Sequence, residues 1–248
     1  MAEYKRPYSL SPAPTGYCPG CLHPLATKLV AEAIEELGQN NNALNVVSVG
    51  CSALNLFTWR GDMIGAAHGR APAVATGIKR SQPDRLVFTY QGDGDLAAIG
   101  LAEIMSAANR GENFTVVFAN NQTYGMTGGQ MAPTTLVGQR TTTTRYGRDP
   151  ETTGYPMKMC ELISVLEAPV FVARYALNSP KGVNDARKAI KKAFRLQLEG
   201  KGFTFIELLT NCPTNWGLSP LDSLEYMNTN TIPYFKPGVY KDKEAETE

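Results

Sequence analysis

The chain has 248 residues, of which 43% are hydrophobic and 19% are charged, enough to bury one sizeable core. Its formal net charge of +1 excludes a protein that binds nucleic acid or a membrane surface through its overall charge. No apolar run reaches the roughly 18 residues of a membrane span, so no transmembrane helix is expected.

An N-terminal arm, residues 1–16, precedes the first regular element. It is polar, carries three prolines and lacks the apolar segment of a signal peptide, so we expect a cytoplasmic protein. We further expect residues 1–248 to form a single domain. Five cysteines are few for a disulfide scaffold of this length. In a reducing compartment, clustered cysteines more often bind metal or perform redox chemistry.

The first predicted elements are a helix and a strand. Apolar residues recur at helical spacing from Leu25 to Leu37, with Pro24 at the start and Gly38 after the end, which favours a helix. Residues 46–49 form a short β-branched run typical of a buried strand.

Strands and helices then alternate along the chain. We predict strands over residues 85–90, 114–119, 170–173 and 203–209, and helices over 96–109 and 183–198. The strands are continuous apolar runs, which indicates a parallel sheet covered on both faces. The notable polar segments follow strand ends, and that edge of an open α/β sheet is where ligands bind.

Three other segments lead to less specific expectations. A loop as long as residues 123–160 is usually functional or an interaction surface. The C-terminal tail, residues 236–248, ends in a charge run over 241–248 that we expect to be solvated. The helix over 183–198 has a basic face, which we expect to be solvated, with docking of an acidic ferredoxin as the alternative. This face consists of Arg187, Lys188, Lys191, Lys192 and Arg195.

A Gly-Asp-Gly tripeptide centred on Asp93 lies between a predicted strand and helix, and Asn121 ends the next strand. Glycines allow backbone N–H groups to approach an anion, and the helix directs its positive end toward it. A carboxylate and an amide oxygen from neighbouring strands suit Mg²⁺ bridged to phosphate, with the Thr123 carbonyl as a third ligand. The tripeptide alone is more often a structural turn. A calcium loop is excluded because Ile104 occupies the position that requires a bidentate glutamate.

This motif resembles the thiamine-diphosphate signature, and residues 120–130 resemble the cofactor loop of 2-oxoacid:ferredoxin oxidoreductase β subunits. The resemblance extends from Tyr17 to Gly217. It implies the diphosphate-binding domain of the thiamine-diphosphate fold, an α/β fold whose mostly parallel sheet has helices on both faces. It also implies Mg²⁺ ligation by Asp93, Asn121 and the Thr123 carbonyl. The residues it places at the cofactor are Gly50, Cys51, Ser52, His68, Gly69, Arg70, Gly92, Asp93, Gly94, Asp95, Asn121, Thr123, Tyr124, Gly125, Met126 and Thr127. For His68, a satisfied buried histidine is an equal alternative.

The pair Cys18 and Cys21 is compatible with a redox dithiol, half a zinc site or half an iron–sulfur site. A thioredoxin-like motif requires a preceding strand, and none is predicted before this pair. A zinc ribbon usually has a second C-x-x-C, and the chain has none. Cys51 and Cys212 follow strands at the same sheet edge as Asp93, and a [4Fe–4S] cluster takes four thiolates. The alternative for each single cysteine is a small apolar residue of the core without a metal-binding role. The family resemblance assigns these four to the cluster, and we expect the fifth, at position 160, to be structural.

The resemblance implies coenzyme A-dependent oxidative decarboxylation of a 2-oxoacid, with electrons passed to ferredoxin. No glutamate stands out as the activator of the cofactor, so we assign no catalytic residue to this chain. The resemblance places that glutamate on a pyrimidine-binding α subunit, within a complex that has γ and ferredoxin-like δ subunits.

The substrate is a separate question. Apolar Leu54 and Met126, expected near the substrate, favour a branched-chain acid such as 2-oxoisovalerate, with 2-oxoglutarate as the alternative. Two rival functions are a cluster-free thiamine-dependent decarboxylase and a zinc-stabilised subunit without catalysis.

Overall fold

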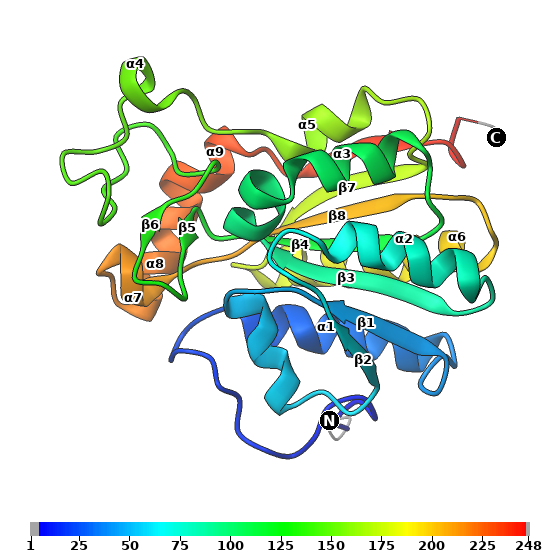
Figure 1. The fold of residues 1–248 in the computed structure, drawn as a ribbon. Coiled ribbons are helices and arrows are strands. Elements are labelled where there is room, and N and C mark those ends of the chain that lie inside the picture. The colour runs from blue at the N-terminus through cyan, green and yellow to red at the C-terminus, as the bar shows by residue number, and fades with distance from the viewer. Residues whose placement is uncertain (1–4, 247–248) are drawn as a thin grey trace.

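A seven-stranded sheet forms the centre of the molecule in a computed structural model that describes residues 5–246 (Figure 1). The strands lie in the order β2-β1-β3-β4-β8-β7-β9. All neighbours are parallel except β7 and β9, which are antiparallel. The mostly parallel sheet that the sequence predicts is confirmed. The strands are β1 (Ala43–Val47), β2 (Asp62–Gly65), β3 (Leu86–Gly92), β4 (Thr115–Asn120), β7 (Phe171–Ala176), β8 (Thr204–Leu209) and β9 (Gly238–Asp242).

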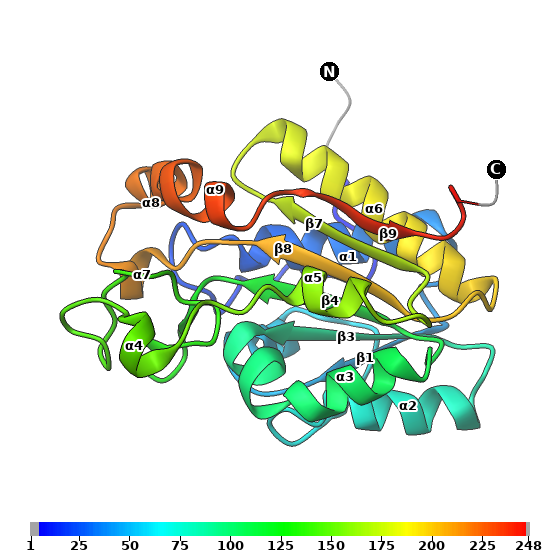
Figure 2. The same ribbon diagram turned by 90° about the horizontal axis from the view of Figure 1, so that it is seen from above.

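Helices cover both faces of the sheet (Figure 2). On one face, α1 (His23–Glu36) and α6 (Pro180–Leu198) pack on Phe88 and Tyr90 of β3. On the other face, α2 (Ala71–Ser81), α3 (Leu101–Asn109) and α5 (Met159–Ser164) pack on a core that includes Val87 of β3. Successive side chains of a strand point to opposite faces, so a strand covered on both sides is apolar throughout. This is why the central strands read as continuous apolar runs.

The smaller elements gather around the carboxyl ends of the strands (Figure 1). A two-stranded hairpin of β5 (Thr123–Tyr124) and β6 (Gln130–Met131) follows β4. The others are η1 (Cys51–Phe57), η2 (Gly94–Ile99), α4 (Pro150–Thr153), α7 (Pro213–Trp216), α8 (Pro220–Tyr226), η3 (Met227–Thr231) and α9 (Ile232–Tyr234). Within residues 5–246, no helix combines the length and the apolarity needed to cross a bilayer.

The helix expected over residues 96–109 is interrupted. Its first part, η2, is a π-helix, and α3 begins only after Gly100. A side chain at Gly100 would meet the carbonyl oxygen of Gly69 at 2.5 Å, so the two backbones pack against each other at this point. This contact between distant segments breaks the continuous helix that the periodicity predicts.

The C-terminal tail differs from the solvated end that we expected. Residues 238–242 form strand β9 at the edge of the sheet. Asp242 contacts Lys192 of α6 at 2.7 Å, and Glu244 contacts Arg195 at 2.7 Å. The acidic tail therefore lies on the basic face of α6. Residues 1–4 of the arm and 247–248 of the tail lie outside the described range.

Two further residues of this basic face also have partners within the chain. Lys191 contacts Glu36 of α1 at 2.9 Å, and Arg187 pairs with the same carboxylate. Arg187 and Lys191 remain 46% and 44% exposed, so the face is solvated as expected but also forms ion pairs within the chain. Because carboxylates of this chain already neutralise much of the face, it is poorly suited to an acidic ferredoxin.

One buried arginine organises the long loop after the hairpin. The guanidinium of Arg148 donates hydrogen bonds to backbone carbonyl groups on both sides of the loop, and its side chain is almost fully buried. The carbonyls belong to Ala132, Pro133, Thr135, Thr153, Gly154 and Tyr155. The loop is therefore an ordered structure whose backbone carbonyls bind the guanidinium of a single buried arginine.

Candidate active site

A cavity of about 100 Å³ opens at the carboxyl ends of β1, β3 and β4. This is the edge at which open parallel sheets bind ligands. Its lining combines the strand ends with η1, η2 and the hairpin loop. The lining residues are His23, Val49, Gly50, Cys51, Ser52, His68, Gly92, Asp93, Gly94, Asp95, Asn121, Thr123, Tyr124, Gly125, Met126 and Thr127. The sequence-predicted segments thus come together in space.

Asp93 lies buried at the start of η2. Its Oδ1 accepts a hydrogen bond from the Gly94 N–H at 2.9 Å, and its Oδ2 accepts one from the Thr134 hydroxyl at 2.7 Å. Burial raises the pKa of Asp93 to about 6, although these hydrogen bonds act to lower it. A buried carboxylate without a counter-charge is costly, and a bound cation would offset that cost. The environment of Asp93 therefore fits a metal ligand.

Asn121 follows β4, the strand next to β3. Its Oδ1 accepts a hydrogen bond from the Thr123 N–H at 3.3 Å, and its carbonyl accepts one from the Trp216 indole at 3.2 Å. Gln122 has a φ of 62°, the only positive φ of a non-glycine residue in the described range. The strained turn presents the amide oxygen of Asn121 at the strand end beside Asp93. A carboxylate and an amide oxygen are ligands that Mg²⁺ accepts.

The glycines of the cavity leave room for an anion. A methyl group added at Gly50 or Gly92 would meet no atom within 4 Å, so both backbones face open space. The hydroxyl of Ser52 is buried in the lining and has no hydrogen-bond partner among the described residues. At Gly94 the opposite holds, because an added methyl would overlap the Tyr124 ring at 2.2 Å. Open space beside glycine backbones, together with a hydroxyl that has no hydrogen-bond partner, suits the binding of a diphosphate.

Asp95, expected to contact the cofactor, uses its carboxylate within the protein. Oδ1 accepts hydrogen bonds from Ser48 at 2.7 Å and from the Gly69 N–H at 2.6 Å, and contacts His68 Nδ1 at 2.5 Å. Oδ2 accepts one from Gln91 at 2.5 Å. Asp95 therefore holds the cavity wall together and orients the imidazole of His68, whose other nitrogen is left for a ligand.

Gly69 and Arg70 are not among the lining residues, so contact of these two with the cofactor stays a prediction. The guanidinium of Arg70 pairs with Glu103 of α3. Gly69 packs on the backbone of Ile99, where an added side chain would come within 2.7 Å. Both residues follow His68, but the chain has already turned from the cavity toward α3.

The two expected substrate-pocket residues have different positions. Met126 lines the cavity and is 48% exposed. Leu54 lies on η1 beside Gly16 of the N-terminal arm and does not belong to the lining. Within this chain, Met126 is therefore the better candidate for contact with a substrate.

Sequence reasoning missed two lining residues, His23 and Val49. His23 is fully buried, contacts the Tyr90 hydroxyl through Nδ1 and stacks on Tyr17 with ring centroids 5.2 Å apart. Burial lowers the pKa of His23 to about 4, so it is neutral at physiological pH. Its position two residues after Cys21 was the only available signal.

Four cysteines converge beside the cavity. The sulfur atoms of Cys51 and Cys212 lie 3.0 and 3.6 Å from the position that a Cβ would take at Gly125. Burial, together with nearby Cys212 and Cys18, raises the pKa of the Cys21 thiol to about 11. Burial, together with nearby Cys212, Cys21 and Cys18, raises the pKa of the Cys51 thiol to about 12. The four thiols are therefore close enough to influence one another.

The four thiols match the donor count of two metal groups. A zinc site needs four donors around one ion, whereas a [4Fe–4S] cluster takes each thiolate on a different iron and holds them further apart. Within residues 5–246, no three His, Cys, Asp or Glu side chains are arranged to hold a single metal ion. Cys160 is buried in the core around α5, apart from this group.

The segment after β8 connects the thiols to the hairpin loop. Asn215 donates hydrogen bonds to the Gly125 carbonyl at 2.9 Å and to the Cys212 sulfur at 3.3 Å. It also packs on Gly129, where an added Cβ would lie 2.9 Å from it. Asn215 and Trp216 were not singled out from the sequence, although they lie in the string Cys-Pro-Thr-Asn-Trp-Gly.

Comparison with known proteins identifies relatives of the whole chain. A family model described as thiamine pyrophosphate enzyme, C-terminal TPP binding domain, matches residues 45–208. The ketoisovalerate oxidoreductase subunit VorA of Methanothermobacter thermautotrophicus is 47% identical over 99% of this chain and 51% of its own length. The 2-oxoglutarate synthase subunit KorB of Methanocaldococcus jannaschii is 35% identical over 87% of this chain and 78% of its own length.

A solved structure extends the comparison to three dimensions. It is the 2-oxoglutarate:ferredoxin oxidoreductase from Magnetococcus marinus with 2-oxoglutarate, coenzyme A and succinyl-CoA bound. Its TM-score is 0.78 at 27% identity, covering 98% of this chain and 86% of the other. The chain spans about half the length of the two VorA relatives. With the site at the matched strand ends, these findings show that the chain belongs to the thiamine pyrophosphate enzymes, as a TPP-binding domain of the 2-oxoacid oxidoreductase subunits.

Proposed function

We propose that this chain is the thiamine-diphosphate-binding β subunit of a coenzyme A-dependent 2-oxoacid:ferredoxin oxidoreductase. The observation that carries the proposal is the position of Gly125. This cofactor-loop residue lines the cavity together with Asp93 and Asn121, and the sulfurs of Cys51 and Cys212 lie 3.0 and 3.6 Å from the position that a Cβ would take on it. A metal–diphosphate site and a thiol site therefore share one wall.

The residues present fit both groups. Asp93, Asn121 and the Thr123 carbonyl would hold Mg²⁺, and the glycine cradle with Ser52 would receive the diphosphate. The four clustered cysteines would hold a [4Fe–4S] cluster. When bound, thiamine diphosphate supplies a carbanion that adds to the 2-oxo carbon, and a neighbouring cluster accepts the electrons released by oxidation. The hairpin loop and Asn215 hold the two sites next to each other.

For the substrate we propose a branched-chain acid, 2-oxoisovalerate. The cavity lining contains no Lys or Arg side chain to pair with the second carboxylate of 2-oxoglutarate, while Met126 and Val49 offer apolar contact. The 47% identity to a ketoisovalerate oxidoreductase subunit supports this substrate. The alternative, 2-oxoglutarate, is favoured by the similarity to 2-oxoglutarate synthase subunits.

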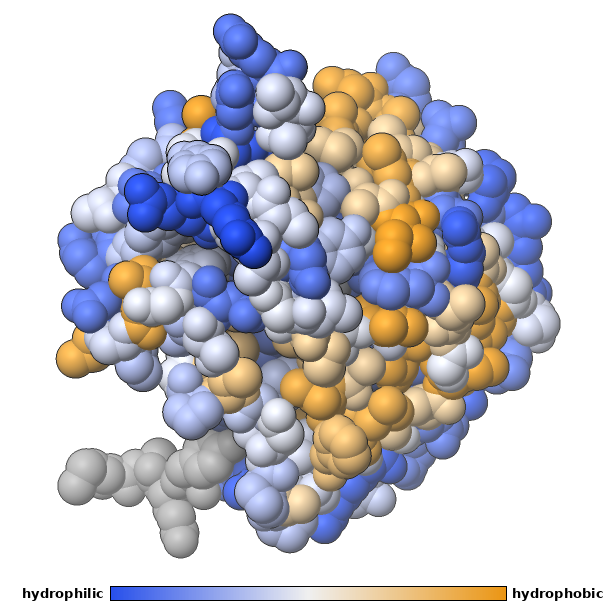
Figure 3. Space-filling view, turned by 60° about the vertical axis from the view of Figure 1, so that its left-hand side comes forward, coloured by the Kyte–Doolittle hydropathy of each residue, from blue (hydrophilic) through white to orange (hydrophobic). Residues whose placement is uncertain are grey.

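A partner subunit is needed to complete the site. The lining contains no glutamate to activate the cofactor, so we propose that an α subunit supplies it together with the pyrimidine-binding domain. Five exposed apolar residues on the elements around the cavity form what we call the apolar rim, and Figure 3 shows apolar side chains gathered over part of that surface. The apolar rim consists of Val49, Leu56, Phe57, Ile99 and Met126. An exposed apolar area of this kind suits subunit contact.

The rest of the assembly is inferred from the kind of chemistry. We propose γ and ferredoxin-like δ subunits, with ferredoxin as the external acceptor and coenzyme A as the acyl acceptor. Five free thiols, four of them beside one cavity, suit a reducing compartment, so we propose a cytoplasmic location.

The decisive experiment is an absorption spectrum and metal analysis of the anaerobically purified protein. A broad band near about 400 nm with about four irons per chain is expected for one cubane cluster. Zinc alone would favour the non-catalytic subunit, and a colourless protein that binds thiamine diphosphate would favour a cluster-free decarboxylase. Either result would remove the cluster from the proposal. As a second check, Asp93→Ala should abolish Mg²⁺-dependent cofactor binding and leave the band unchanged.

A further inference from the structure

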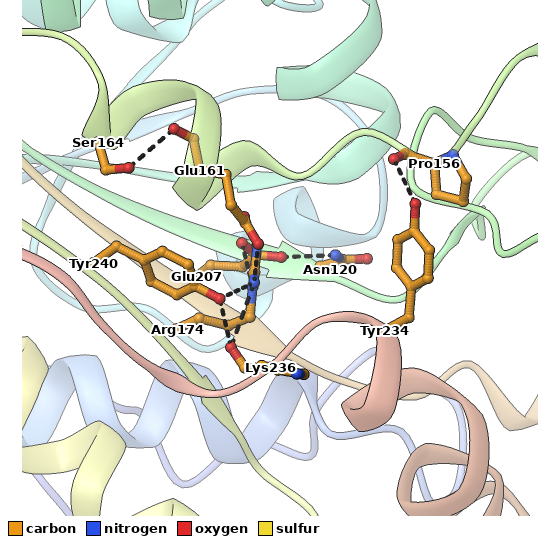
Figure 4. A network of polar contacts seen from close by, with 9 residues as sticks. All are labelled: Asn120, Pro156, Glu161, Ser164, Arg174, Glu207, Tyr234, Lys236 and Tyr240. Carbon is orange, nitrogen blue, oxygen red and sulfur yellow. Dashed lines mark hydrogen bonds and ion pairs between the residues drawn. The ribbon is translucent and has the colours of Figure 1, made fainter.

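A fully buried ion pair lies next to the proposed magnesium site. Arg174 of β7 and Glu207 of β8 both have side chains that are 0% exposed, and Arg174 Nε lies 2.8 Å from Glu207 Oε2 (Figure 4). The guanidinium also donates to Glu161 of α5 at 2.6 Å and to the Tyr240 hydroxyl at 2.5 Å. Burying an ion pair often stabilises a fold less than apolar residues of the same volume would. A role beyond stability is therefore worth seeking.

The second oxygen of Glu207 leads to the site. Glu207 Oε1 accepts a hydrogen bond from Asn120 Nδ2 at 2.8 Å, on the side away from Arg174. The other end of the same amide, Asn120 Oδ1, accepts one from the Gln122 N–H at 3.3 Å. Asn120 therefore connects the buried pair to the turn that carries Asn121, and both of its hydrogen bonds are made inside the protein.

The charge on Glu207 determines how the Asn120 amide is oriented. An ionised carboxylate only accepts hydrogen bonds, so the NH₂ end of Asn120 must face Glu207 and its oxygen must face Gln122. Arg174 supplies the counter-charge of the Glu207 carboxylate, since a charged pair is far more favourable in the interior than a lone carboxylate. With the oxygen in that place, the Gln122 N–H is satisfied in its left-handed conformation, φ 62°, which a non-glycine residue rarely adopts.

We propose that Glu207 and Arg174 are positioning residues that act through Asn120 to set the direction of the Asn121 amide oxygen. This inference rests on the proposed function, because it takes Asn121 as a magnesium ligand. Neither Glu207 nor Arg174 forms a hydrogen bond with Asn121, the proposed magnesium ligand. Their effect is to remove alternative conformations of the turn, so that the metal does not have to order it on binding.

The test compares the Mg²⁺ dependence of cofactor binding in the complex of this chain with its proposed pyrimidine-binding partner subunit. Thiamine diphosphate retained after rapid desalting is measured across a series of Mg²⁺ concentrations for the wild type, Asn120→Ala and Glu207→Gln. Both variants should need about 10- to 100-fold more Mg²⁺, the range found when hydrogen-bond partners of metal ligands are removed. Saturating Mg²⁺ should restore full retention, since the ligands themselves are unchanged. If Glu207→Gln does not fold because Arg174 loses a partner, Asn120→Ala leaves the ion pair intact and still decides the question.

Gln197 provides a matched control. Its buried side chain binds the backbone of Val87 and the Thr115 hydroxyl at the opposite end of the sheet. Gln197→Ala should therefore lower the temperature of unfolding without changing the Mg²⁺ midpoint. An equal shift in Gln197→Ala would mean that general loosening is the cause and would overturn the inference.

Two further outcomes separate the inference from the proposed function. If Glu207 acts through Asn120, the double variant should need no more Mg²⁺ than Asn120→Ala alone. Folded single variants with the wild-type midpoint would overturn the positioning role and leave the proposed function intact. A wild-type complex that retains no thiamine diphosphate at any Mg²⁺ concentration would overturn the proposed function itself.

Discussion

At the scale of single residues, the site depends on a few side chains whose neighbours are already fixed by the protein. Asp95 is the clearest example, because four donors from three segments hold its carboxylate. It is polar, buried and in the motif, yet its role is to hold His68 and the cavity wall. A polar residue in a motif can therefore hold the residues around a binding site in place without binding the metal or cofactor itself.

The cysteines give a prediction at this scale. Cys212→Ser should bleach the band near about 400 nm, because a hydroxyl replaces one of the four thiolates that the cluster needs. Cys160→Ser is the matched control, since this thiol is buried in the core around α5 and should leave the band intact. Iron analysis and absorption spectroscopy of both purified variants decide the matter. Equal loss of the band in the two proteins would contradict the assignment.

Much of the candidate site was predictable from the sequence, and the exceptions have a physical reason. Asp93 and Asn121 each follow a buried strand, and the ends of adjacent parallel strands must meet at one edge. Arg70 was placed at the cofactor because it follows His68 in the chain. Its true direction depends on Glu103 of α3, a contact between segments that no local pattern encodes.

At the scale of elements, Arg148 should control the order of the long loop. Arg148→Met keeps the apolar stem but leaves the loop carbonyls without their donor. We expect a loss of about 3 kcal/mol in the free energy of unfolding, the order expected for hydrogen bonds to a buried charged group. Hydrogen exchange should also become faster over residues 132–155. Arg145→Met, at an exposed position of the same loop, should change neither quantity; a similar loss there would refute the special role of Arg148.

A second prediction for elements concerns acid stability. Burial on its own would raise the pKa of Glu112, but hydrogen bonds from Arg80 of α2 and from Arg110 after α3 outweigh it and lower the pKa. The resulting stabilisation is fully present above the ordinary value of 4.5 and is lost as pH falls through the lower folded value. Urea midpoints of wild type and Glu112→Gln should therefore differ at neutral pH and converge in acid. A constant difference at every pH would contradict this linkage.

The elements differ in how far local sequence determines them. The central strands were predictable because burial on both faces requires a continuous apolar run, as in β4. Strand β9 was not, because Lys241 and Asp242 make it read as a charged tail. It forms because β7 offers an open edge and α6 offers Lys192 and Arg195 to its acidic residues. Tertiary contacts that the sequence pattern does not show decide this element.

At the scale of the whole molecule, the apolar rim should govern assembly. Phe57 is 67% exposed, so Phe57→Ser should fold normally but bind the pyrimidine-binding partner about ten-fold more weakly or worse, as expected for an aromatic anchor. Sedimentation velocity of the mixed subunits measures this affinity. Val165→Ser, at a 77% exposed position after α5, is the control and should bind normally. Unchanged affinity in Phe57→Ser would place the partner elsewhere.

The two outer strands of the sheet have a consequence for how the protein behaves in a crowded solution. β2 is short and exposed and begins at Asp62, and β9 ends in Lys241 and Asp242. Short, charged edges are poor templates for the backbone of another chain, which is how natural sheets avoid growing into fibrils. We therefore expect the proposed partner subunits to bind through the faces of the molecule, where side chains select the partner, and not by extension of the sheet.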